Sequence, residues 1–172
     1  MMSNTLLESV VKKNRARLIP FMLALYVLAF LDRSNIGFAK ETYQLDTGLS
    51  NEAYALGAGI FFVVYAFLGV PANLLMRKFG ARRWIGCTTL LWGVLSAAMA
   101  WADTEAKFLL VRTLLGAAEA GFFPGMIYLT SQWFPQQNRA SIMGLFYMGA
   151  PLALTLGSPL SGALLEMHGF MG

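Results

Sequence analysis

The chain has 172 residues, of which 57% are hydrophobic and only 13% are charged, and its mean hydropathy is +0.57. A water-soluble domain carries about a quarter charged residues, so this composition excludes an ordinary soluble protein and indicates a polytopic membrane protein. With one cysteine, Cys87, and one histidine, His168, the chain has no zinc-binding cluster, and we expect no metal site.

Five segments are long and apolar enough to cross a bilayer core of about 30 Å, which takes roughly 20 helical residues. The predicted fold class is an all-α polytopic membrane protein, with a tail at 1–17 and spans at about 18–39, 53–76, 84–102, 108–134 and 140–165. The connections are short and polar, and no second domain is expected. Glycines in "GAGIFF" and "GAAEAGFFPG" predict close helix packing, and Pro124 predicts a bend in the fourth span.

Lysine and arginine are distributed unevenly between the connections. The tail and the second and fourth connections hold nine of them, whereas the first and third hold one each, Lys40 and Lys107. The positive-inside rule therefore predicts a cytoplasmic N-terminus. This distribution also accounts for the net charge of +4, so the lipid bilayer, and not a nucleic acid, is the expected partner.

The first span contains the adjacent charges Asp32 and Arg33. If they ended the helix, the apolar run 19–31 before them would be thirteen residues long, which is too short to cross a bilayer. The segment between Arg17 and Lys40 has the right length. We therefore predict that both charges lie inside the membrane, where charged residues are costly and usually functional.

The fourth span contains Arg112 and Glu119, seven residues apart and so on one helix face. At a rise of 1.5 Å per residue, Asp32 lies roughly 20 Å from the cytoplasmic start of its helix and Arg112 roughly 7 Å from its outer start. These depths nearly coincide in a core of about 30 Å. If the two helices are neighbours, Asp32, Arg33 and Arg112 form one charged layer, with Glu119 nearer the cytoplasm.

The residue types suggest a division of labour. Arg33 and Arg112 keep their charge and suit an anionic substrate, whereas Asp32 and Glu119 can take up protons in a low-dielectric site. Two charges of each sign make the empty site nearly neutral. A bound carboxylate adds one negative charge and so favours the uptake of a proton, and a bound proton likewise favours binding of the carboxylate. That linkage is what a symporter needs. Tyr65, in the second span, is a candidate hydrogen-bond donor to the substrate or to a neighbouring helix.

Two other interpretations remain open. The four charges could be ion pairs that only join helices, in a membrane protein that transports nothing, although buried ion pairs contribute little stability. The chain could also belong to an organic-anion exchanger without proton coupling. An enzyme is not expected, because no nucleophile–base or metal constellation is visible.

Four stretches resemble one family: "LDRSNIGFA", "RKFGARRW", "RTLLGAAEAGFFPGMIYLTSQWFP" and "GAPL". They are similar to the anion:cation symporter branch of the major facilitator superfamily, and in particular to enterobacterial sugar-acid carriers. The resemblance implies proton-coupled uptake of an anionic sugar acid, such as L-rhamnonate, across the inner membrane, with no cofactor besides the coupling proton. It assigns substrate binding to Arg33, Arg112 and Tyr65, and proton coupling to Asp32 and Glu119.

The resemblance also implies twelve spans in two halves. We therefore expect this sequence to be an N-terminal piece, the first five helices of a six-helix bundle, that lacks its C-terminal half and does not transport alone. The loop "NLLMRKFGARRW" is similar to the cytoplasmic gating motif at Gly80, Arg82 and Arg83. It departs from that motif at Asn73 and Arg77, where the family has Gly and Asp, which puts the usual Asp-based gate contact in doubt.

Overall fold

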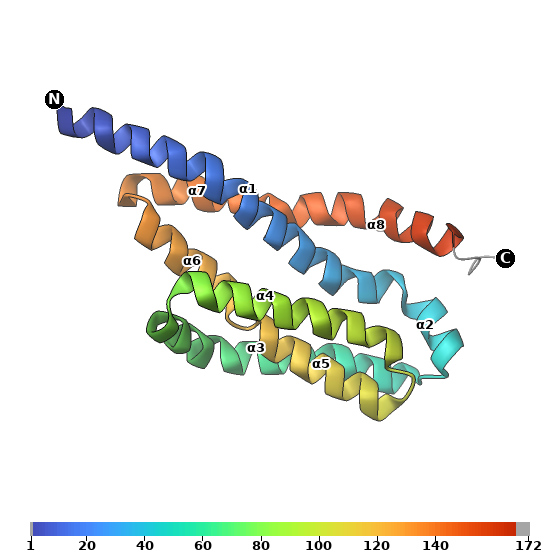
Figure 1. Ribbon diagram of the computed structural model, residues 1–172. Helices are drawn as coiled ribbons and strands as arrows, with labels where there is room; N and C mark the ends of the chain where they lie inside the picture. The colour runs from blue at the N-terminus through green and yellow to red at the C-terminus, as the bar shows by residue number, and fades with distance from the viewer. Residues whose placement is uncertain (1, 168–172) are drawn as a thin grey trace. The chain divides into compact units, whose positions relative to one another are not determined.

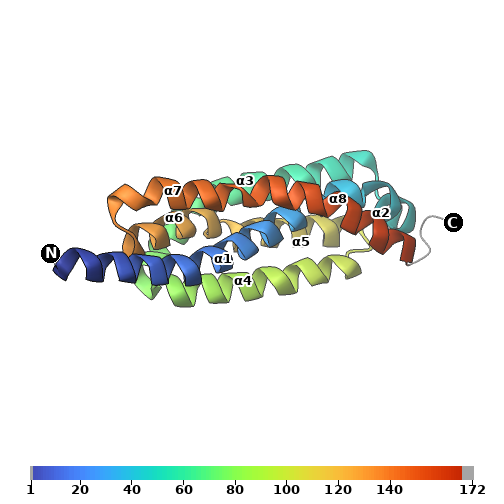
Figure 2. The same ribbon diagram turned by 90° about the horizontal axis from the view of Figure 1, so that it is seen from above.

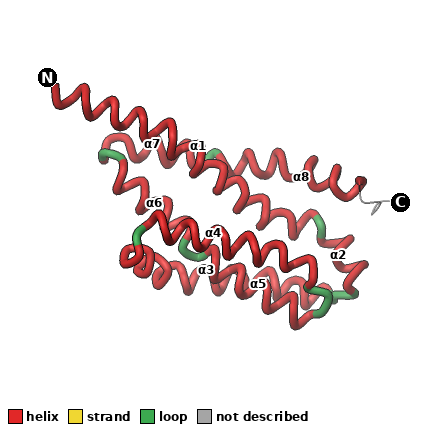
Figure 3. Tube along the Cα trace, in the orientation of Figure 1, coloured by secondary structure: helices red, strands yellow, loops and turns green. Residues whose placement is uncertain are grey.

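The protein is described by a computed structural model, which covers the backbone of residues 2–167 and the side chains of residues 8–164. The described part of the chain is helical, with short turns and no strands (Figures 1 and 3). Within it, five helical segments have the length and apolar composition needed to cross a membrane, which confirms the predicted fold class: Glu8–Phe38, Asn51–Phe79, Ala81–Trp101, Glu105–Trp133 and Gln136–Leu164. His168 lies outside the described residues.

The chain divides into two compact units, residues 1–42 with 130–172 and residues 43–129. The first, called here the terminal unit, contains α1 (Met2–Phe38), the end of α6 (Phe122–Trp133), α7 (Gln136–Tyr147) and α8 (Gly149–Met167). The second, called here the central unit, contains α3 (Asn51–Phe79), α4 (Ala81–Ala98), the 3-10 helix η1 (Met99–Trp101), α5 (Glu105–Glu119) and the beginning of α6.

In the terminal unit, α1 packs against α7 and α8, which run in the same direction as α1 (Figures 1 and 2). The ring of Tyr26 lies 4.2 Å from that of Phe146 between their centroids. Further along both helices, the Ser161 hydroxyl donates a hydrogen bond of 3.0 Å to Oδ1 of Asn35. The buried residues of α1, from Met22 to Ala29, follow the i, i+3, i+4, i+7 spacing of one helix face.

In the central unit, α3 and α5 run side by side in the same direction, and α4 runs the opposite way (Figure 1). Glycines bring α3 and α5 together: Gly57 packs against the ring of Phe108, and Gly116 packs against the backbone of Phe61. The predicted close packing at "GAGIFF" and "GAAEAGFFPG" is confirmed at these two glycines. Gly59, in the first of these stretches, faces open space.

Two of the long helical segments are broken. The fourth span is broken at Ala120 and Gly121, between α5 and α6, and the fifth at Met148, between α7 and α8. Each break lies at, or one residue after, the position four residues before a proline, which is Pro124 or Pro151. Proline has no N–H to donate to the backbone carbonyl at that position. A proline alone does not break these helices, since α1, α3 and α8 continue through Pro20, Pro71 and Pro159.

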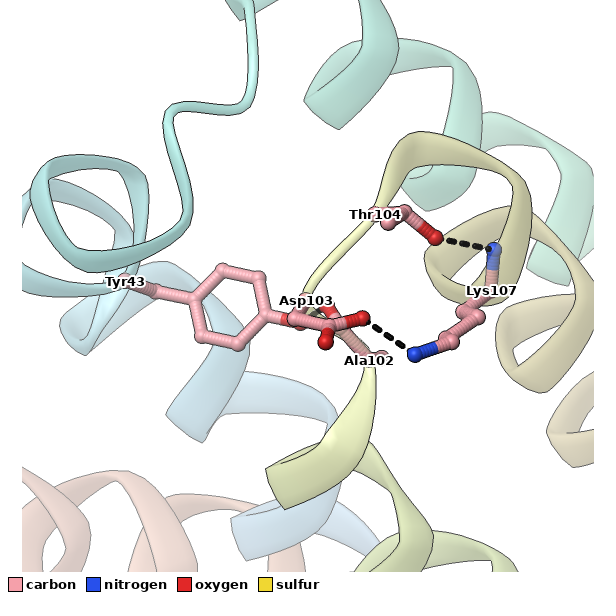
Figure 4. A network of polar contacts seen from close by, with 5 residues as sticks. All are labelled: Tyr43, Ala102, Asp103, Thr104 and Lys107. Carbon is pink, nitrogen blue, oxygen red and sulfur yellow. Dashed lines mark hydrogen bonds and ion pairs between the residues drawn. The ribbon is translucent and has the colours of Figure 1, made fainter.

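The connection 40–52 is not simply a polar loop, because it contains the short helix α2 (Lys40–Thr47). Figure 4 shows how the side chain of Tyr43 reaches the turn before α5. Its hydroxyl donates a hydrogen bond of 2.5 Å to the carbonyl of Ala102, and its ring lies 5.7 Å from the ring of Phe108. These contacts hold α2, which belongs to the central unit from Tyr43 onward, against the turn before α5.

The same turn carries an ion pair and a helix cap (Figure 4). Nζ of Lys107 lies 2.5 Å from Oδ1 of Asp103, and the Thr104 hydroxyl accepts a hydrogen bond of 3.4 Å from the backbone N–H of Lys107. The hydrogen bond from Lys107 lowers the pKa of Asp103 below its usual 3.8. Burial, and then the negative charge of Asp103, raise the pKa of Tyr43 above 10.0, so the phenol remains a donor at neutral pH.

Candidate functional site

Arg112 is the best-defined of the predicted site residues. It lies on α5 with 3% of its surface exposed. Its Nε donates a hydrogen bond of 3.2 Å to the carbonyl of Gly57 on α3, and its guanidinium carbon lies 4.4 Å from the centroid of the Phe61 ring. A buried cation is tolerated only where polar and aromatic groups replace water, and α3 supplies both kinds of group.

Tyr65 belongs to the same part of the central unit. Its half-buried side chain lies one helical turn after Phe61, and the two rings stack with centroids 6.1 Å apart. Phe61 therefore contacts both Arg112 and Tyr65, and the structure gathers these predicted substrate-binding residues around one aromatic ring.

Glu119 is the last residue of α5, and only 1% of its surface is exposed. Arg112 and Glu119 are the buried ionisable residues of this helix, as the seven-residue spacing predicts. Glu119 also directly precedes the break at Ala120. Glu119 thus lies on the same face of α5 as Arg112, at the helix end where the regular helix is interrupted.

Asp32 and Arg33 lie in the terminal unit, on α1, and both are half-buried. The helix continues past them to Phe38, which confirms that the charged pair lies inside a helix and does not end it. The predicted layer that joins this pair to Arg112 stays a prediction, as do the roles of all four charged residues.

The candidate gating motif occupies the turn between α3 and α4. Gly80 has a φ of 86°, which a residue with a side chain rarely adopts, and its N–H donates to the carbonyl of Met76 at 2.8 Å. Arg82 and Arg83 are exposed in the first turn of α4. The positive φ of this turn is therefore enough to account for a glycine at position 80. The gating role of the three residues stays a prediction.

Sequence reasoning missed the residues that surround Arg112. Phe61 is fully buried, and Tyr54 is 6% exposed with its ring 5.4 Å from that of Phe108. An aromatic residue in an apolar helix carries no signal of its own. The available signal is spacing, because Tyr54, Phe61 and Tyr65 recur at seven and four residues and so share one face of α3.

Comparisons with known proteins identify the family and the fold. A family model described as the Major Facilitator Superfamily matches residues 22–171. The chain is 92% identical over 171 residues to "Inner membrane transport protein RhmT" of Escherichia coli (strain K12), an alignment that covers 99% of this chain and 40% of that protein. It is 50% identical over 170 residues to a "Putative tartrate transporter" of Agrobacterium vitis, covering 99% of this chain and 38% of that protein.

A solved structure shows the same fold. It is that of a bacterial homolog of the human lysosomal transporter Spinster, with a TM-score of 0.83 and 22% sequence identity, over 89% of this chain and 33% of that chain. The chain spans about two fifths of the length of the curated relatives named above. These relatives are named as transporters and not as enzymes. The chain belongs to the major facilitator superfamily.

Proposed function

We propose that this chain forms the first five membrane helices of a secondary transporter that takes up an anionic sugar acid, such as L-rhamnonate, together with protons across the inner membrane. The observation that carries the proposal is the burial of Arg112, whose guanidinium is fixed by Gly57 and Phe61 inside a membrane helix bundle. A permanently charged group at 3% exposure needs a reason to be there, and binding an anion is the simplest one.

The relatives support an anionic substrate. The A. vitis relative has tartrate, a dicarboxylate, in its name, and the E. coli relative is named as an inner membrane transport protein. A planar guanidinium can bind a carboxylate through two parallel hydrogen bonds, which suits Arg112 and Arg33 to this task. Tyr65 would add a hydrogen bond to the substrate.

Proton coupling follows from charge balance. Asp32 and Glu119 offset the two arginines, so a bound carboxylate leaves one excess negative charge unless a proton is taken up. Glu119, at 1% exposure, lies in the same membrane-spanning segment as Arg112. The proton is the only coupling ion that this scheme needs, and it requires no cofactor.

The remaining parts of the proposal concern orientation and the rest of the carrier. We infer a cytoplasmic N-terminus from the excess of Lys and Arg in the tail and around Gly80, Arg82 and Arg83. That turn would then face the cytoplasm and act as a gate. Alternating access needs a second half, which would correspond to the part of the longer relatives that this chain does not match.

The test uses the E. coli relative with this chain exchanged for its matching segment, called here the chimeric carrier. Uptake of labelled L-rhamnonate into membrane vesicles is measured with and without an imposed pH gradient. We expect Arg112→Ala and Arg33→Ala to abolish uptake at normal protein levels, whereas Arg15→Ala, at an exposed position of α1, leaves it unchanged. Glu119→Gln should retain binding and lose the response to the pH gradient.

Each other interpretation has its own outcome in this assay. Loss of folded carrier in Arg112→Ala, with uptake per folded molecule unchanged, would support purely structural ion pairs. Uptake that ignores the pH gradient in the unmodified chimeric carrier would indicate an exchanger and remove the coupling role of Glu119.

A further inference from the structure

Contacts with Gly57 and Phe61 bear on the orientation of the Arg112 guanidinium. Its Nε donates a hydrogen bond of 3.2 Å to the carbonyl of Gly57, and its guanidinium carbon lies 4.4 Å from the centroid of the Phe61 ring. A carboxylate can approach a guanidinium in two bidentate ways, across Nε and Nη2 or across Nη1 and Nη2. The hydrogen bond to Gly57 occupies Nε, which the first of these approaches would also need.

Phe61 is itself rigidly placed. No part of its side chain is exposed, and its backbone carbonyl packs against Gly116, where a β-carbon would stand 2.5 Å from the carbonyl oxygen. The next aromatic residue on the same face of α3, Tyr65, stacks on the Phe61 ring. The ring therefore has little freedom to turn away from Arg112.

We propose that Phe61 is a positioning residue for the anion site: its ring holds the Arg112 guanidinium in the orientation that binds the substrate carboxylate. This inference rests on the proposed function, because it assigns Phe61 a role toward a substrate that Arg112 binds. Phe61 itself touches no substrate in this scheme and acts only through Arg112.

The physical basis is the attraction between a cation and the negative face of an aromatic ring, which is strongest where water is excluded. When that attraction weakens, the guanidinium spends less time in the binding orientation. The apparent affinity then falls in proportion to the population of that orientation. The transport step after binding is unchanged, so KM rises and the maximal rate stays the same.

Fluorination of the ring tests this without changing its shape much. Phenylalanine with one, two or three ring fluorines is incorporated at position 61 of the chimeric carrier, since each fluorine withdraws electron density from the ring face. KM for labelled L-rhamnonate should rise stepwise with fluorine number, by about threefold or more across the series, at a constant maximal rate per folded carrier. The same series at Phe67, which is 78% exposed on α3, should leave KM unchanged.

A purely structural role for Phe61 gives a different result. The amount of folded carrier would then vary, and KM would not follow fluorine number. A flat KM at position 61, or an equal slope at Phe67, overturns the inference. When Arg112→Lys is combined with each member of the series, KM should stay above that of the parent carrier. Lysine has neither a planar group to stack on the ring nor the forked donors of arginine.

Arg112→Ala in the same assay separates this inference from the proposed function. If Arg112→Ala abolishes uptake and the fluorine series is flat, the anion site stands and the role of Phe61 is wrong. If Arg112→Ala transports with the parent KM, the proposed anion site itself is wrong.

Discussion

The carbonyl oxygen of Phe61 on α3 lies so close to Gly116 on α5 that a β-carbon at position 116 would stand 2.5 Å from it. Such a distance is well inside van der Waals contact, and the opposing atom belongs to the backbone, which cannot rotate away. The α3–α5 interface therefore depends on the absence of a side chain at Gly116, and that interface is also the one that holds Arg112.

Gly116→Ala should destabilise the fold, and Gly59→Ala should not. At position 116 the added methyl group forces α3 and α5 apart, at a cost of about 1–3 kcal/mol in the free energy of unfolding. At position 59 nothing lies within 4 Å, so the better helix propensity of alanine should add about 0.5–1 kcal/mol. Unfolding of the chimeric carrier in detergent measures both. Equal stability of the two variants would contradict the packing described above.

The attachment of α2 through Tyr43 should depend on pH in one direction. Below pH 10.0, the usual pKa of the phenol, the protonated hydroxyl donates to the carbonyl of Ala102, and its contribution is complete. Because the pKa of Tyr43 is raised in the folded protein, that contribution is lost as the pH rises through the raised value. A spin label at position 45, where Leu45 is 85% exposed, should become more mobile above pH 10.

Two variants serve as controls for that measurement, in a chain that also carries Cys87→Ser so that only position 45 is labelled. Tyr43→Phe should show a mobile label at every pH and no step, because the donor is gone. Asp103→Asn should move the step to lower pH, since it removes the second cause of the raised pKa, although burial still keeps the pKa of Tyr43 above 10.0. A step that persists in Tyr43→Phe would assign the titration to another group.

Arg139 has a role in the terminal unit that lysine should not fill. Its Nε donates to the carbonyl of Phe134 at 2.9 Å and its Nη2 to the carbonyl of Ser131 at 2.8 Å, so it caps the end of α6 from the first turns of α7. Arg139→Ala should cost about 2 kcal/mol of stability and Arg139→Lys about 1 kcal/mol, because lysine can replace one of the bonds. Arg15→Lys, at an exposed position, is the control in the same unfolding measurement. A lysine variant as stable as the parent would refute the capping role.

Local properties of the sequence were enough to predict the five helical segments and the placement of Asp32 and Arg33 inside one of them. Hydropathy, segment length and the distribution of Lys and Arg act through the membrane, which imposes the same demand on every span. The breaks are only half predictable, since Pro124 and Pro151 follow a break whereas Pro71 lies in a continuous helix.

The tertiary structure alone decided which faces of the helices meet. The sequence shows that Arg112 and Glu119 share a face of α5, because a helix repeats every 3.6 residues. It does not show that Gly57 and Phe61 receive Arg112, since glycine and phenylalanine are common throughout an apolar helix and contacts between helices depend on how two surfaces fit. The charged residues were therefore found from the sequence, and the groups that fix the guanidinium of Arg112 only from the packing of α3 against α5.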